Sequence, residues 1–153
     1  MLRQVDVCLA SGGQLSFSDA VGLHGLIFEC LGESGEAQLA DSLHESSLHA
    51  YAQRLEQREA GNWHWVLTFL NDELYERIWI GALAARQEIF LKKRGITLGM
   101  GARTEQQMSL EDLYAIFTCG DSHRIFSLRL VTPVAFKQAG EYVFHPDLVL
   151  IYQ

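Results

Sequence analysis

Residues 62–70, with the sequence NWHWVLTFL, form the strongest strand pattern in the chain, and they run directly into a helix. Aromatic and β-branched side chains favour strands. One face of this strand carries Trp63, Trp65, Leu67 and Phe69. Asn71 then provides a helix N-cap, and acidic residues fill the first turn, so the pattern predicts a helix over residues 71–87. Leu74, Ile78 and Leu83 are its expected buried side.

Four further strand patterns surround this unit. Residues 3–10 alternate apolar and polar side chains, which predicts a half-buried strand. Residues 48–55 alternate again, and the polar run 56–62 with Gly61-Asn62 predicts a hairpin turn into the strand at 62–70. Residues 88–93 and 96–102 supply strand segments after the helix. The glycines of GITLGMGAR indicate a strand bulge or turn there, because a lone G-x-G is weak evidence for a phosphate cradle.

A helical stretch separates the first two strands. Ser16 or Ser18 can cap its start, and an apolar face follows at helical spacing: Leu23, Leu26, Ile27 and Leu31. Glycines then interrupt the pattern, and a second short helix is predicted over residues 36–43. His44 stands at the end of that second helix.

The order strand, helix, strand, strand, helix, strand predicts an α+β, ferredoxin-like βαββαβ domain of the RRM-like type. Right-handed crossovers would place both helices on one face of a four-stranded antiparallel sheet. An additional helix, capped by Ser109 with Asp112 at the capping-box position, and a strand at 124–131 extend the C-terminal end. We expect one domain over residues 1–153. The apolar, strand-like ending LVLIYQ suggests that it is the N-terminal half of a two-domain protein.

Composition excludes several kinds of protein. A net charge of −7 argues against nucleic-acid binding by bulk electrostatics, so any RNA site requires a local basic patch. The three cysteines are scattered through apolar runs and lack metal spacing, which predicts no metal and no disulfide framework. No apolar run reaches the length of a membrane span, and the N-terminus lacks a signal peptide, so we expect a cytoplasmic protein without a membrane partner.

Two interpretations of His44 compete on spacing alone. Histidine is favoured at a helix C-terminus because the last carbonyls carry partial negative charge. Histidine is also the side chain whose ordinary pKa suits acid–base catalysis near neutral pH. His64, between two tryptophans, points to the opposite sheet face from them and is interpreted as solvent-facing or partly packed.

Four segments together resemble one family. They are LHGLIFECLGESGEAQLADSLHE, WHWVLTFLNDELYERI, SLEDLYAIF and RLVTPVAFKQAGEYVFHPDLVL, of which the TPVAFK motif is the most specific. In this order they are similar to the CRISPR-associated endoribonucleases of the repeat-associated (RAMP) superfamily, which cut precursor CRISPR RNA within its repeats. The resemblance covers the N-terminal half of a full member.

The resemblance implies RNA cleavage that needs neither metal nor cofactor. A ribose 2′-hydroxyl attacks the adjacent phosphate and leaves a cyclic phosphate and a 5′-hydroxyl. Such a reaction requires a base near the 2′-hydroxyl, an acid near the leaving oxygen and cationic donors around the phosphorane. The 2′-hydroxyl also restricts the substrate to RNA.

The same resemblance assigns roles residue by residue. His44 in SLHE matches the family's catalytic histidine, which follows a leucine at the end of the second short helix. Phe28 stands where members often have a tyrosine, and His24, one turn earlier, is expected to help in its place. His49 in LHAY is the nearest match to a lysine that often precedes the second strand. Catalysis is therefore expected at His44, with His49 and His24 as helpers.

Repeat RNA lies across positively charged surface in this family, so basic residues are the expected phosphate contacts. These are Lys92, Lys93, Arg94, Arg103, Arg124, Arg129 and Lys137. A solvated turn is the simpler interpretation of residues 92–94. The resemblance also admits other CRISPR-associated effector subunits, or a second copy of the chain, as partners.

Two alternatives to an enzyme stay open. One is a non-catalytic RNA-binding or assembly subunit of the same superfamily, which Phe28, His49 and the negative charge favour. The other is a ferredoxin-like domain that dimerises through its sheet and has no RNA role.

Overall fold

The computed structural model describes residues 1–11, 13–46, 50–58, 61–118, 136–138 and 141–143. The chain divides into two compact units, Met1–Cys119 and Gly120–Gln153. In the second unit, β6 (Phe136–Gln138) and β7 (Glu141–Val143) form an antiparallel pair. The strand predicted at 124–131 lies outside the described residues, as does most of the TPVAFK motif.

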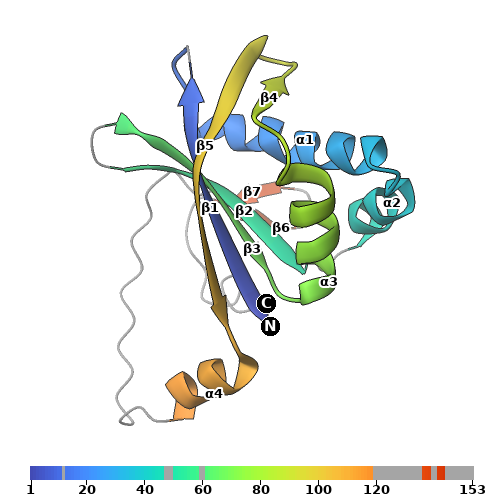
Figure 1. Cartoon of the computed structure of the whole chain (residues 1–153), viewed down its shortest axis with the longest axis vertical. Helices are drawn as coiled ribbons and strands as arrows, with labels where there is room; N and C mark the ends of the chain where they lie inside the picture. The colour runs from blue at the N-terminus through green and yellow to red at the C-terminus, as the bar shows by residue number, and fades with distance from the viewer. Residues whose placement is uncertain (12, 47–49, 59–60, 119–135, 139–140, 144–153) are drawn as a thin grey trace. The chain divides into compact units, whose positions relative to one another are not determined.

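The first unit contains a five-stranded antiparallel sheet with the strand order β2-β3-β1-β5-β4 (Figure 1). The strands are β1 (Leu2–Ser11), β2 (Tyr51–Gln57), β3 (Trp63–Phe69), β4 (Glu88–Leu91) and β5 (Ile96–Met108). In the centre, Val7 of β1 lies opposite Trp65 of β3 and Arg103 of β5. The α+β class is thereby confirmed. The prediction of four strands was wrong, because β4 adds a fifth by pairing with the start of β5.

Helices α1 (Ala20–Glu33) and α2 (Ala37–Glu45) follow β1, with a 3₁₀ turn, η1 (Phe17–Asp19), before them. The helix predicted after β3 begins as α3 (Asp72–Leu74) and continues as a π-helix, η3 (Tyr75–Leu83). Asn71 caps it as expected, since its Oδ1 accepts the Leu74 N–H at 2.8 Å. None of the described helices is both long and apolar enough to cross a membrane.

The fourth helix, α4 (Leu110–Thr118), begins at the predicted capping box. The Ser109 hydroxyl accepts the Asp112 N–H at 2.9 Å, and the Asp112 carboxylate accepts the Ser109 hydroxyl at 2.7 Å. The hydrogen bonds that the Ser109 hydroxyl and backbone N–H donate to the carboxylate lower the pKa of Asp112. The helix stands at the end of β5, which runs six residues beyond the predicted end of the strand at Ala102 (Figure 1).

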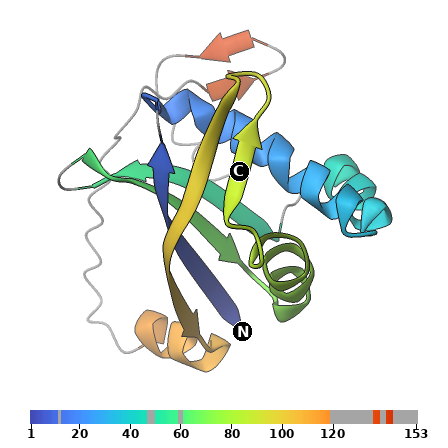
Figure 2. The ribbon, with the colours of Figure 1, turned by 45° about the horizontal axis from the view of Figure 1, so that its top comes forward.

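The hydrophobic core lies between one face of the sheet and the helices α1, α2 and η3, which Figure 2 shows on the same side of the sheet. Odd-numbered residues of β1 and β3 face it, as the alternation predicted: Val5, Val7, Leu9, Trp65, Leu67 and Phe69. The helices contribute Leu23, Ile27, Leu31, Ile78 and Leu83, all fully buried. Burying this apolar surface is the main term that stabilises the fold.

The glycine-rich segment of β5 holds a bulge against β1. The strand register shifts between Val7 and Leu9, which is the irregularity predicted from GITLGMGAR. A Cβ at Gly101 would lie 3.2 Å from the Cys8 carbonyl oxygen, so a side chain at this position would crowd the neighbouring strand.

Candidate functional site

The rings of His24, Phe28 and His44 form a row across α1 and α2. His24 and Phe28 are one turn apart on α1 and contact edge to face, with ring centroids 5.0 Å apart. The Phe28 ring also lies edge-on to His44, at 5.9 Å. His44 is exposed in the last turn of α2, whereas His24 and Phe28 are half-buried. Two of the three predicted imidazoles therefore lie on the same side of the domain, with Phe28 between them.

Tyr51, the first residue of β2, contacts the imidazole of His24. Its hydroxyl lies 3.2 Å from His24 Nδ1, and the two rings stack at 6.2 Å with an interplanar angle of 19°. Tyr51 is buried, and burial raises its pKa to about 12. The hydroxyl therefore stays protonated at neutral pH and can orient the imidazole. Spacing did not predict this contact, because it joins two elements 27 residues apart.

A groove of about 520 Å³ opens beside His44. It is lined by Phe28, Glu29, Gly32, Ala37, Ala40, Asp41 and His44. Two carboxylates stand in this groove with the imidazole, so its electrostatics do not by themselves attract a phosphate. Among the described residues, no group of three or more His, Cys, Asp or Glu side chains is placed to hold a metal ion.

His49, the third predicted catalytic residue, lies outside the described residues, as do Arg124 and Arg129. For Lys137 only the backbone is described, in β6. The remaining predicted phosphate contacts, at positions 92–94 and 103, belong to the first unit.

Arg94 and Arg103 are held by the protein itself. Arg94 Nη1 donates to both oxygens of the buried Asp19 carboxylate, at 2.8 and 2.9 Å. Arg103 donates to the backbone carbonyls of Ala84 and Arg86, just after η3 ends. Both guanidinium groups thus bridge distant elements, which sequence spacing could not indicate.

Lys92 and Lys93 lie in the predicted turn between β4 and β5, and both are exposed. Lys92 Nζ is 3.0 Å from Glu29 on α1. Lys93 makes no ion pair or hydrogen bond within the part of the chain that the structure describes. Both ammonium groups are therefore accessible to a ligand.

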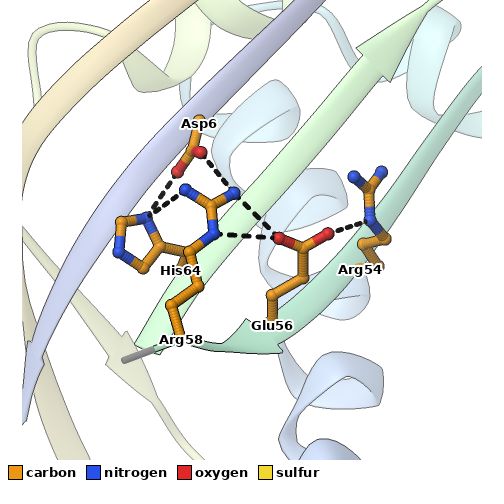
Figure 3. Close-up of polar contacts among 5 residues, drawn as sticks. All are labelled: Asp6, Arg54, Glu56, Arg58 and His64. Carbon is orange, nitrogen blue, oxygen red and sulfur yellow. Dashed lines mark hydrogen bonds and ion pairs between the residues drawn. The ribbon is translucent and has the colours of Figure 1, made fainter. Parts of the chain in front are cut away.

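His64 belongs to a polar network on the sheet face opposite the helices (Figure 3). Its Nδ1 is 2.6 Å from Asp6 Oδ1, and Arg58 Nη2 is 2.6 Å from Asp6 Oδ2. Arg58 also contacts Glu56, which pairs with Arg54. The hydrogen bond from Arg58 is the main cause of a lowered Glu56 pKa. His64 is thus partly packed, which is one of the two interpretations left open by the sequence, and the sequence pattern did not indicate its acidic and basic partners.

The fold resembles that of two solved Cas6 structures. One solved structure, a Cas6 product complex, matches 93% of this chain and 56% of its own with a TM-score of 0.66 and 22% identity. A second Cas6 product complex matches 67% of this chain and 40% of its own with a TM-score of 0.55 and 22% identity. No family model matches the chain.

Sequence comparison identifies the relatives more specifically. The CRISPR-associated endoribonuclease Cas6 of Mycobacterium tuberculosis is 32% identical over 133 residues, which is 86% of this chain and 41% of the relative. The Streptococcus thermophilus Cas6 is 28% identical over 134 residues, which is 88% of this chain and 52% of the relative. The chain is a homologue of the Cas6 CRISPR-associated endoribonucleases. It spans about half the length of the curated relatives it matches.

Proposed function

We propose that this chain carries the histidine-bearing domain of an endoribonuclease that binds CRISPR repeat RNA and cleaves precursor CRISPR RNA. The relatives named Cas6 endoribonucleases support this most directly, because their similarity extends over 86% of the chain. The exposed position of His44 beside a groove supports it from geometry.

The proposed reaction is metal-independent transesterification. The ribose 2′-oxygen attacks phosphorus, the bond from phosphorus to the 5′-oxygen breaks, and a cyclic phosphate and a 5′-hydroxyl result. A base takes the proton of the 2′-hydroxyl, and an acid delivers a proton to the departing 5′-oxygen. His44 is the proposed acid–base residue, since its ring is exposed at the groove.

His24 and His49 are the proposed helpers. His24 is held by Tyr51 and separated from His44 by Phe28, so its proposed part is to position the substrate beside His44. Repeat RNA would reach this side of the domain across basic residues, among which Lys92 and Lys93 are accessible. Other CRISPR-associated subunits, or a second copy of the chain, remain proposed partners.

A ferredoxin-like core also remains a proposal. In it β1, β2, β3 and β5 would be the four core strands, and β4 would be an addition at the edge. The strand order β2-β3-β1-β5-β4 supports it. We further propose that the domain is the N-terminal half of a two-domain protein, which the half-length match to Cas6 relatives supports.

The second candidate function is RNA binding or assembly without cleavage. Two observations favour it. Phe28, which cannot donate a proton, lies between the two imidazoles. In addition, most described arginines are ion-paired on a chain with a net charge of −7.

The test is cleavage of labelled repeat RNA from the host's own array in EDTA. A matched substrate carries one 2′-deoxynucleotide at the cleavage position. We expect the all-ribose RNA to be cut to a cyclic phosphate end and the deoxy substrate to bind without being cut. Binding of both without cutting would favour the assembly subunit. If neither RNA binds at low or at high salt concentration, the remaining alternative is a domain that dimerises through its sheet and has no RNA role.

A further inference from the structure

A second groove, of about 360 Å³, lies between α1 and the β4–β5 hairpin, which run past each other in Figure 2. On the α1 side it is lined by Val21, Gly22, Gly25 and Leu26, and on the β4 side by Phe90 and Leu91. Val21 is 69% exposed and Phe90 is 49% exposed. Gly25 leaves open space, since a Cβ there would meet no atom within 4 Å. We call this the α1–β4 groove.

One end of the α1–β4 groove is a turn that the protein holds in place. Arg94 reaches from this turn to the buried Asp19 carboxylate, and its Nη2 donates to the Gln14 carbonyl at 3.0 Å. Gly95 closes the turn with a φ of +62°, a conformation that favours glycine. The backbone that carries Lys92 and Lys93 is therefore fixed against α1.

The net charge of the residues that line the α1–β4 groove is positive, whereas that of the whole chain is negative. Lys92, Lys93 and Arg94 line it against the carboxylates of Asp19 and Glu29, which leaves one positive charge in excess on a chain of net charge −7. The Lys92–Glu29 pair is solvent-exposed, at 69% and 42%, and exposed pairs are weak. Lys93 is unpaired among the described residues. An anionic ligand can therefore engage both lysines at little cost.

We propose that the α1–β4 groove binds one unpaired nucleotide of RNA. The base stacks on Phe90 between β4 and the glycine face of α1, and its phosphate lies at Lys92 and Lys93. The proposal rests on the proposed RNA-binding function and adds a second site, whose lining shares only Glu29 with the His44 groove.

The chemistry of the groove favours a nucleotide over an apolar peptide. Exposed aromatic rings stack on unpaired bases of any sequence, and lysine contacts add a salt-dependent phosphate term. An apolar peptide would use Val21 and Phe90 but would leave the lysines without a role. A flat base with a phosphate at one edge uses both parts of the lining.

Gly25→Leu is the variant that tests the α1–β4 groove most directly. It fills the groove from a helical position with open space around it, and replacing glycine within a helix favours folding. Gly25→Ala is its matched control, since a methyl group adds little volume. Phe90→Leu removes the ring but keeps an apolar side chain, and Tyr114→Leu is the control for an exposed aromatic outside the groove. Lys93→Glu tests the phosphate contact, with Lys93→Arg as the charge-preserving control.

Two probes are used with the full 153-residue chain: octauridylate and the 2′-deoxy-substituted repeat RNA. We expect Gly25→Leu, Phe90→Leu and Lys93→Glu each to weaken binding of both by about tenfold, while the three controls stay within twofold. Lys93→Glu should also reduce the slope of log binding constant against log salt concentration, by the amount expected for the loss of about one phosphate contact. Circular dichroism melting confirms that each variant is folded.

The outcomes separate this proposal from the proposed function. If the wild-type chain binds and cleaves repeat RNA and the three groove variants bind as tightly as wild type, the nucleotide site is wrong and the nuclease stands. If groove variants lose octauridylate binding but wild type cuts no repeat RNA, the site stands and the nuclease is wrong. If Phe90→Leu leaves RNA binding unchanged but converts a dimer into a monomer by sedimentation, the groove is a protein interface and the proposal is overturned.

Discussion

The Tyr51 hydroxyl lies 3.2 Å from Nδ1 of His24, which couples the first residue of β2 to the histidine row on α1. Since burial raises the pKa of Tyr51 to about 12, this hydroxyl keeps its proton throughout the range in which RNA cleavage would be measured. The contact therefore fixes an imidazole without adding a charge.

Tyr51→Phe should lower kcat for repeat RNA cleavage about fivefold and leave KM unchanged, because a lost orienting hydrogen bond contributes about 1 kcal/mol. Single-turnover and steady-state kinetics measure the split. Arg54→Gln, on the other face of β2, is the control. A Tyr51→Phe enzyme with unchanged kcat would show that this hydrogen bond does not contribute to the role proposed for His24.

Phe28→Tyr should raise the cleavage rate by about tenfold, because it adds a hydroxyl donor between the two imidazoles. Phe28→Leu removes the ring from both histidines and should lower the rate instead. The measurement is the single-turnover rate of repeat RNA cleavage for the three proteins. Equal rates for phenylalanine and tyrosine would mean that no reacting oxygen comes near position 28.

Arg94→Met should destabilise the first unit by about 2 kcal/mol, because it leaves the Asp19 carboxylate buried without its cation. Arg94→Lys retains the charge and should lose less. Urea unfolding followed by tryptophan fluorescence gives both values. A loss within 0.5 kcal/mol for Arg94→Met, on the order of an ordinary surface substitution, would contradict a structural role for this pair.

Low pH should weaken the ion pair that joins the start of α2 to η3. Arg77 donates hydrogen bonds to the Glu36 carboxylate and holds the pKa of Glu36 below its usual value. The ion pair therefore stabilises the fold above the unfolded-state pKa, and this contribution disappears as the pH falls through the lower folded-state pKa. The melting temperatures of wild type and Arg77→Met should differ at pH 7 and approach each other as the pH is lowered into the acid range. A difference that persists unchanged in acid would contradict the assignment.

Local patterns predicted most of the first unit. Several features depend only on residues that are neighbours in the sequence, so they could be predicted from it. These are the alternation in β1 and β3, the Asn71 and Ser109 caps and the hairpin at Gly61. The fifth strand was not predicted to join the sheet, because the pairing of β4 with β5 depends on where the chain turns after η3. The π-helical geometry of η3 likewise has no simple sequence signal.

The candidate site was predictable only in part. The helical spacing of His24 and Phe28, and the place of His44 at the end of a helix, followed from the sequence. The Tyr51 contact, the Asp6–His64 pair and the engagement of Arg94 by Asp19 did not, because each joins residues 27 or more positions apart. Such pairs depend on strand register and on turn geometry, which a single sequence does not encode in its spacing.

The proposed function depends most on His44, and the cleavage kinetics of single-histidine variants test its role. Repeat RNA is cleaved in EDTA under single-turnover conditions by wild type, by His44→Ala and by His64→Ala, a histidine control from the opposite face of the sheet. We expect His44→Ala to be slower by at least about 100-fold and His64→Ala to cut within about twofold of wild type. Cleavage by His44→Ala at the wild-type rate would show that His44 is not the acid–base residue.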